Sequence, residues 1–186
     1  MFILKAIYAF FVDTIQTLIL AASIFLVIYV FLLRPFQVSG ESMIPTFQDR
    51  EYILTNIITM RLESVQRGDV IVFKAPTDNN KDFIKRVIGL PGETVTIKNG
   101  SVYINDKKID ESRYLAPVVK TLPYGNYIEE NESITARTGE YIVMGDNRSS
   151  SSDSREWGPL KKSEIIGKPF FVYWPFNKLR LIKNPF

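Results

Sequence analysis

The residue types that are missing narrow the chemistry open to this chain. Among its 186 residues there is no histidine and no cysteine. This absence excludes thiol nucleophiles, disulfide frameworks, Ser-His-Asp triads and the zinc sites that rely on Cys or His ligands. If the chain moves protons near neutral pH, its general base must be a Lys, Asp, Glu or Tyr side chain. The candidates are therefore serines beside such a base, and we expect no metal and no other cofactor.

One serine lies in a segment with an unusual backbone on both sides. Ser42 belongs to Ser39-Gly-Glu-Ser-Met-Ile-Pro-Thr46, where Gly40 frees the backbone before it and Pro45 stiffens the backbone after it. Such a segment can present a hydroxyl as a nucleophile. Taken alone, it more often holds an ordinary loop serine or a serine that caps a helix. A nearby base is needed to favour the first interpretation.

A lysine in a β-like run is the best candidate for that base. In Phe83–Leu90 alternate side chains share a face, so Lys85 points with Phe83 and Val87 while Arg86 points the other way. An ammonium group on an apolar face is costly, because burial without a partner removes its hydration. Desolvation lowers the Lys pKa from about 10.4, and the neutral amine can then take a proton from a serine hydroxyl. The alternative is an edge strand on which Lys85 faces solvent.

A polar segment further along the chain could hold such a site together. Gly145–Arg155 contains two acid–arginine pairs, Asp146 with Arg148 and Asp153 with Arg155. These pairs would form a charge-assisted scaffold, and the serines between them would be left to orient a nearby amine. A solvated surface turn is the alternative interpretation.

The sequence around these residues predicts short β-strands separated by turns, and these strands must position the candidate side chains. Asn99-Gly100 between two alternating runs is a strong signal of a tight hairpin. Residues 111–138 are polar and mixed, and we expect a small, loop-rich insertion there. Short strands at this spacing favour a mainly antiparallel β fold. The expected strands are Val70–Phe73, Phe83–Leu90, Thr94–Lys98, Ser101–Asn105, Glu140–Met144, Lys168–Trp174 and Leu179–Ile182.

The N-terminal part has a different character. The run Thr14–Leu33 carries no charge and is rich in Leu, Ile, Val and Phe. As a helix, its roughly 20 residues would cover about 30 Å, the thickness of the hydrocarbon core of a bilayer. A buried core helix and a cleavable secretory signal are the alternatives, but the run is too uniformly apolar for the first and too long for the second. We expect a retained anchor in residues 1–34 and a separate domain in residues 35–186.

The charge of the chain bears on its partners. A net charge of +3 and a pI near 9.0 would suit nucleic acid or an anionic membrane surface. No run of Lys or Arg is longer than two residues, so we expect no nucleic-acid partner. The expected partner is the lipid bilayer. The flanking charges Lys5, Asp13 and Arg34 hardly distinguish the two orientations of the anchor, and the sequence does not define an oligomeric state.

Taken together, these segments resemble the bacterial type I signal peptidases, in particular their Gram-positive form. These are membrane-anchored serine proteases that remove signal peptides from exported proteins. The resemblance covers the chain from the anchor to Trp174. It rests on four segments in order, similar to the family's nucleophile motif, following strand motif, general-base motif and last motif: Ser39–Thr46, Arg67–Phe73, Phe83–Gly92 and Gly145–Arg155.

The resemblance implies a role for each matching residue. Ser42 would be the nucleophile and Lys85 the general base, and Ser151 would form a hydrogen bond that orients the Lys85 amine. Bracing by ion pairs would fall to the charged residues Arg86, Asp146, Asp153 and Arg155. The shallow apolar pockets for small substrate side chains at −1 and −3 of the cleavage site would be lined by Phe36, Val38, Met43 and Ile84.

The resemblance also implies a fold and a location. The fold would be an antiparallel β-sheet catalytic domain of two lobes behind a single N-terminal transmembrane helix. The protein would lie in the cell membrane with a cytoplasmic N-terminus and with its catalytic groove on the outer face, acting on preproteins. Some members carry a serine two positions before the nucleophile that assists the oxyanion hole. Here Gly40 occupies that position, so the donor that would work beside the Ser42 N–H is left open.

Three other functions are compatible with parts of the pattern. A dedicated maturation peptidase of a pilus or conjugation system would use the same serine and lysine. A membrane-tethered self-cleaving protein related to the SOS repressors would use them too, although the anchor and the lack of a DNA-binding segment count against it. A non-enzymatic anchored β domain that binds envelope partners would need neither Ser42 nor Lys85.

Overall fold

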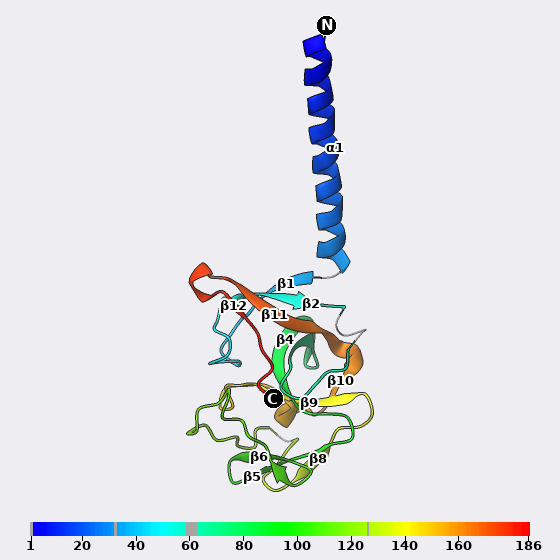
Figure 1. Ribbon diagram of the computed structural model, residues 1–186. Coiled ribbons are helices and arrows are strands. Elements are labelled where there is room, and N and C mark those ends of the chain that lie inside the picture. The colour runs from blue at the N-terminus through cyan, green and yellow to red at the C-terminus, as the bar shows by residue number, and fades with distance from the viewer. Residues whose placement is uncertain (1, 32, 59–62, 126) are drawn as a thin grey trace.

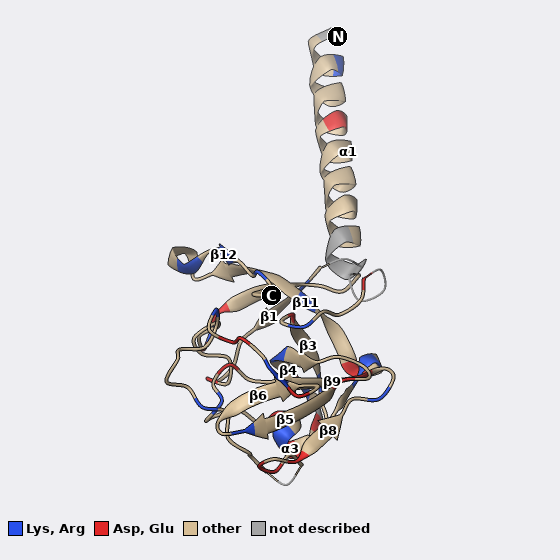
Figure 2. Cartoon of the chain, turned by 60° about the horizontal axis from the view of Figure 1, so that its bottom comes forward, with Lys and Arg blue, Asp and Glu red and all other residues tan. Residues whose placement is uncertain are grey.

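The computed structural model describes residues 2–31, 33–58, 63–125 and 127–186. A long helix, α1 (Phe2–Phe31), projects from a β domain (Figure 1). Its segment Ile3–Val27 is long and apolar enough to cross a membrane, and none of it is buried against the domain. Charged residues are scattered over the β domain, whereas α1 carries only Lys5 and Asp13 (Figure 2).

The helix ends earlier than the sequence predicts. We expected the apolar run to continue to Leu33 and the anchor to include Arg34. Both residues instead belong to strand β1 (Leu33–Gln37), which pairs with β2 (Tyr52–Asn56). Pro35 explains the difference, because proline disfavours a helical conformation in the residue before it and has no N–H to donate. The predicted boundary at residue 34 therefore falls inside the first strand of the domain.

Two antiparallel sheets form the domain, which confirms the predicted fold class. The larger sheet has the order β1-β2-β11-β3-β4-β9-β10, with β12 paired to β11, and the smaller has the order β7-β6-β5-β8. The remaining strands are β3 (Val70–Ala75), β4 (Asp78–Gly89), β5 (Thr94–Lys98), β6 (Ser101–Ile104), β7 (Lys107–Lys108), β8 (Ser133–Thr135), β9 (Glu140–Met144), β10 (Leu160–Lys161), β11 (Ile165–Trp174) and β12 (Arg180–Leu181). The short helices are α3 (Ser154–Trp157), η1 (Lys162–Glu164) and η2 (Phe176–Lys178).

The predicted strands agree with the observed ones most closely where local signals are strong. Strands β5 and β9 have the predicted bounds, and the β5–β6 turn has Asn99 and Gly100 at φ 51° and 74°, as a two-residue hairpin requires. Strand β4 begins five residues before the predicted start, because polar residues pair with β3 there. Within residues 111–138, β8 is the one strand in the described part of the chain.

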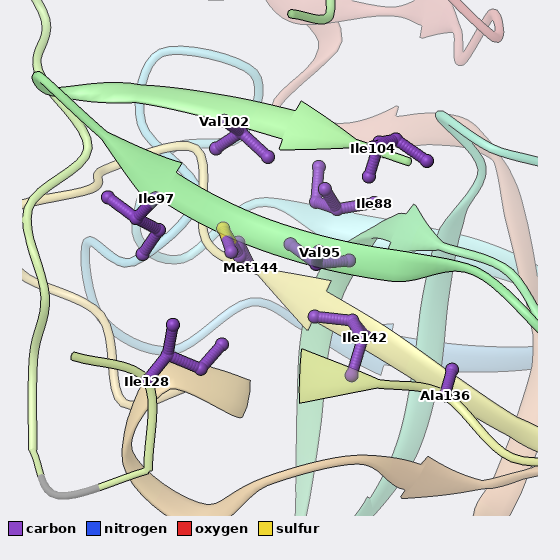
Figure 3. Packing of buried hydrophobic residues seen from close by; sticks show 9 residues of the cluster. All are labelled: Ile88, Val95, Ile97, Val102, Ile104, Ile128, Ala136, Ile142 and Met144. Atoms are coloured by element: carbon purple, nitrogen blue, oxygen red, sulfur yellow. The ribbon is translucent and has the colours of Figure 1, made fainter. Parts of the chain in front are cut away.

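The apolar core joins the two sheets. Side chains of β4 and β9 pack against side chains of β5 and β6, and one cluster contains Ile88, Val95, Ile97, Val102, Ile104, Ile128, Ala136, Ile142 and Met144 (Figure 3). Two further clusters pack on the larger sheet, one including Ile53 and Val72 and the other including Phe73 and Val143. Strands β3, β4 and β9 are thereby fixed on both faces, and they form a rigid support for the polar residues on and beside them, such as Lys85 on β4.

Candidate active site

The structure brings Ser42 and Lys85 into contact. Ser42 lies in the turns that follow β1, and Lys85 lies in β4. The Nζ atom of Lys85 donates a hydrogen bond to Oγ of Ser42 at 2.8 Å and a second one to the carbonyl oxygen of Ile84 at 3.0 Å. The two residues are far apart in the sequence, so their contact is a product of the folded sheet and not of local spacing.

The surroundings of Lys85 favour its neutral form. The side chain is buried, with only 4% of the residue exposed, and Nζ lies 5.1 Å from the centroid of the Phe83 ring. Burial lowers the pKa of Lys85 from 10.5 to about 8, while the negative charges of Asp153 and Asp146 act in the opposite direction. The predicted shared face of Phe83 and Lys85 is therefore present, and the solvent-facing alternative is wrong.

The turn that holds Ser42 depends on Gly40. Gly40 has φ of 90°, in the left-handed region, and a Cβ atom there would meet nothing within 4 Å. Its N–H donates to Oδ1 of Asp49 at 2.8 Å. The turns that follow are closed by backbone hydrogen bonds from Ile44 to Glu41 and from Phe47 to Met43. Glycine is required at this position by its conformation and not by crowding, and its N–H is already used within the protein.

The acid–arginine pairs differ in part from the prediction. Asp146 accepts two hydrogen bonds from Arg86, at 2.8 Å from Nε and 2.6 Å from Nη2, and does not form a side-chain pair with Arg148. Asp153 pairs with Arg155 as expected, with both distances 2.8 Å. Both pairs are almost completely buried. The prediction of an Asp146–Arg148 pair was wrong. Because β4 and β9 are neighbours in the sheet, Arg86 lies beside the start of the loop that follows β9, next to Asp146.

Arg148 has a partner that the sequence did not indicate. Its guanidinium group forms a two-pronged ion pair with Glu111, and Nη1 also contacts the hydroxyl of Thr121. Nε of Arg148 donates to the carbonyl oxygen of Gly145 at 3.0 Å. Nothing local marks Glu111 among the 20 acidic residues of the chain, because the pair spans 37 positions and exists only in the folded protein.

Ser151 is close to the site but does not form the predicted hydrogen bond. Its Oγ is buried and has no hydrogen-bond partner within the described residues. The hydroxyl instead lies against Gly145, where a Cβ atom on the glycine would come within 2.2 Å of it. The Lys85 amine is held by Ser42 and by the carbonyl of Ile84, so its orientation here does not depend on Ser151.

An open groove of about 290 Å³ leads to the contact between Ser42 and Lys85. Three of the four predicted pocket residues line it, namely Phe36, Val38 and Ile84. Met43 does not. Its side chain is 1% exposed and packs into the core behind the groove, because the turn after Ser42 directs it inward. Two further apolar residues in the lining, which the sequence did not indicate, are Ile53 from β2 and Val72 from β3.

The arrangement can therefore perform nucleophilic chemistry without a metal. A serine hydroxyl contacts a buried amine of lowered pKa at the edge of an apolar groove, which is the geometry of an activated nucleophile. In the parts of the chain that the structure describes, no three acidic side chains gather into a group that could hold a metal ion.

Known proteins are similar to this sequence over most of its length. The profile of the family described as "Signal peptidase, peptidase S26" matches residues 11–174. Signal peptidase IB of Staphylococcus aureus is 35% identical, covering 93% of this chain and 96% of that protein. Signal peptidase I of Bacillus amyloliquefaciens is 38% identical, covering 92% of each chain. A crystal structure of a signal peptidase I from Enterococcus faecalis is 34% identical, covers 57% of this chain and 97% of that chain, and gives a TM-score of 0.48.

The extent of these matches settles the relationship that the four segments predicted. A family profile that covers most of the chain, and relatives above 30% identity that are covered almost completely, agree with the antiparallel fold and with the contact between the serine and the lysine. The chain belongs to the S26 family of signal peptidases, a family of serine endopeptidases.

Proposed function

We propose that this protein removes signal peptides from exported preproteins, with Ser42 as the nucleophile and Lys85 as the general base. The observation that carries the assignment of these two residues is the 2.8 Å contact between Nζ of Lys85 and Oγ of Ser42. In a chain without His or Cys, a buried lysine amine is the base that is in reach of the hydroxyl. Membership of the S26 family supplies the substrate class.

The reaction follows from this contact. When the amine is neutral, the Ser42 hydroxyl donates its proton to the Nζ lone pair while Oγ bonds to the carbonyl carbon of the substrate. The carbonyl of Ile84 accepts an N–H from the amine and so turns the lone pair towards Ser42. The tetrahedral intermediate breaks its C–N bond, and Nζ returns the proton to the leaving amine. A water molecule then attacks the acyl carbonyl while the same amine takes its proton. Nζ passes this proton to Oγ of Ser42 as the acyl–Oγ bond breaks, which releases the new carboxyl end and restores the free serine and the neutral amine.

The groove is suited to small substrate side chains. Phe36, Val38 and Ile84 line shallow apolar walls next to Ser42, and we assign to them the side chains at the −1 and −3 positions. Met43 has no direct part, because it is buried behind the groove. The buried ion pairs of Arg86 with Asp146 and of Arg155 with Asp153 would brace the segment at 145–155, from which the Asn147 N–H donates to the carbonyl oxygen of Ser42.

The location is the remaining part of the proposal. Helix α1 would cross the cell membrane once, with the N-terminus in the cytoplasm and the β domain on the outer face, where translocated preproteins become accessible. The support is the apolar segment Ile3–Val27, which no part of the domain covers. Both enzyme and substrate would then be held at one bilayer, so weak pockets suffice for capture.

Cleavage of a preprotein by the full-length protein tests the assignment. Ser42→Ala should abolish cleavage and leave the fold intact, since the change removes only Oγ. Ser163→Ala, at an exposed serine in η1, is the matched control and should cleave like the wild type. Turnover by Ser42→Ala at the wild-type rate would exclude Ser42 as the nucleophile.

The orientation is tested separately. Protease added to intact protoplasts should degrade the β domain from outside. Protection of the domain until the cells are lysed would reverse the proposed orientation, without affecting the assignment of Ser42 and Lys85. A broad range of cleaved preproteins would distinguish a general signal peptidase from a dedicated maturation peptidase.

A further inference from the structure

The loop at residues 145–148 holds the backbone of the proposed nucleophile. The N–H of Asn147 donates to the carbonyl oxygen of Ser42 at 3.0 Å, and its side-chain amide donates to the carbonyl oxygen of Glu41 at 3.2 Å. Gly145 lies so close that a Cβ atom there would come within 2.5 Å of the Ser42 carbonyl oxygen. The position of the Ser42 hydroxyl therefore depends on where this loop sits.

Arg148 connects this loop to the segment at residues 111–121. The residue is 2% exposed, and Nε holds the carbonyl oxygen of Gly145 at 3.0 Å. Its two terminal nitrogens bind both carboxylate oxygens of Glu111. A guanidinium bound in this two-pronged way has a fixed plane, so Glu111 determines where Arg148 holds the loop.

Tyr114 connects the same segment to the other buried arginine. Its hydroxyl donates to Oε1 of Glu111 at 2.5 Å. Its ring lies against Arg86, with 4.3 Å between the centroid and Cζ of the guanidinium. Arg86 in turn holds Asp146, the second residue of the loop. Glu111 and Tyr114 together therefore contact both arginines that position residues 145–148.

We propose that Glu111 and Tyr114 are positioning residues for signal-peptide cleavage, which act through Arg148 and Arg86 to keep the 145–148 loop seated against Ser42. They do not line the groove and do not contact the substrate. Their effect is to keep Oγ of Ser42 within hydrogen-bond distance of Nζ of Lys85. The proposal rests on the function proposed above, and it makes the segment at 111–121, which lies in the region expected to be a small, loop-rich insertion, a part of the catalytic scaffold.

Two conservative variants test this proposal. Glu111→Gln keeps the size of the side chain but removes its charge and one of its two acceptor atoms for Arg148. Tyr114→Phe keeps the ring on Arg86 and removes only the hydroxyl that binds Glu111. Glu130→Gln is the matched control, because Glu130 lies in the same insertion but accepts its hydrogen bond from Asn99, at the β5–β6 turn.

The measurement is kcat and KM for cleavage of a preprotein by the full-length protein in detergent, with the thermal unfolding midpoint of each variant. Small displacements of reacting groups cost large factors in rate, so we expect kcat to fall at least about tenfold for Glu111→Gln, with KM within about twofold of the wild type. Tyr114→Phe should lower kcat in the same direction. The double variant should lose less than the product of the two single losses, because the residues act as one unit. Glu130→Gln should keep the wild-type kcat.

Two results would overturn the proposal. One is a kcat within about twofold of the wild type in both variants. The other is a loss that disappears once the rate is divided by the folded fraction. If Glu111→Gln does not fold, Tyr114→Phe decides alone. Ser42→Ala, measured in parallel, separates this proposal from the proposed function. If Ser42→Ala is inactive while Glu111→Gln and Tyr114→Phe are fully active, the positioning role is excluded and the proposed function is retained.

Discussion

The rate of cleavage should depend on pH through the amine of Lys85. Burial lowers the pKa of this amine from 10.5 to about 8, against the opposing charges of Asp153 and Asp146. At pH 7 about one amine in ten is then neutral, whereas an ordinary lysine would be neutral in roughly one molecule in three thousand. The fold therefore supplies about 300 times more of the active base at neutral pH than an exposed lysine would.

The assay is kcat/KM for a preprotein between about pH 6 and 10, a window that brackets this pKa by about two units on each side. We expect a single rise with pH and an inflection near the pKa of about 8, because a general base works only when it is unprotonated. No histidine is present to produce such a limb. Lys85→Arg should be inactive throughout, since guanidinium stays protonated. A flat profile, or an active Lys85→Arg, would show that another group is the base.

The same pKa predicts a cost in stability. The folded protein disfavours the charged amine, so the penalty is complete below the folded pKa of about 8 and disappears as pH rises towards the unfolded value of 10.5. A shift of this size corresponds to about 3 kcal/mol at pH 7. Lys85→Met should therefore be at least as stable as the wild type near pH 7 in urea denaturation of the full-length protein, and this advantage should shrink at higher pH. An advantage that does not change with pH would contradict burial as the cause.

Two further predictions concern the loop behind Ser42. Asp146→Asn leaves the guanidinium of Arg86 buried without a charged partner and should cost about 3–5 kcal/mol in urea denaturation. The charge of Asp146 raises the pKa of Lys85. In the Asp146→Asn protein that remains folded, the rise of kcat/KM with pH should therefore occur at a lower pH than in the wild type. An inflection at the wild-type pH would refute this coupling. Gly145→Ala places a Cβ 2.5 Å from the Ser42 carbonyl oxygen, so it should cost about 1–3 kcal/mol and lower kcat. If Gly145→Ala has wild-type stability and kcat, the 145–148 loop can move away from Ser42 without cost, which would contradict this reasoning.

The sequence predicts the parts of the fold that short-range physics determines. Asn99-Gly100 requires positive φ at both positions, and the hairpin of β5 and β6 forms around it. Alternation along β4 correctly places Lys85 with Phe83. The end of α1 was missed by two residues, although Pro35 is visible in the sequence and explains it.

The pairing of buried charges was beyond the reach of sequence reasoning. Asp146 lies two residues from Arg148 but pairs with Arg86, because the register of β4 and β9 places Arg86 opposite Met144, two residues before Asp146. Glu111 becomes the partner of Arg148 only when the insertion folds back over the loop. Each choice depends on which elements become neighbours, and spacing along the chain carries no information about that.

The connection between α1 and β1 has a consequence for which peptide bonds can be cut. A single position separates Phe31, the last residue of the helix, from Leu33, the first residue of the strand. Strand β1 is fixed in the sheet beside β2, and Ser42 follows its last residue by five positions. With α1 in a bilayer, the domain would therefore hold Ser42 at a fixed distance from the membrane surface. Only peptide bonds at that distance from the lipid would be cut, so the choice of bond would depend on the length of the substrate's apolar segment as well as on the side chains that flank the bond.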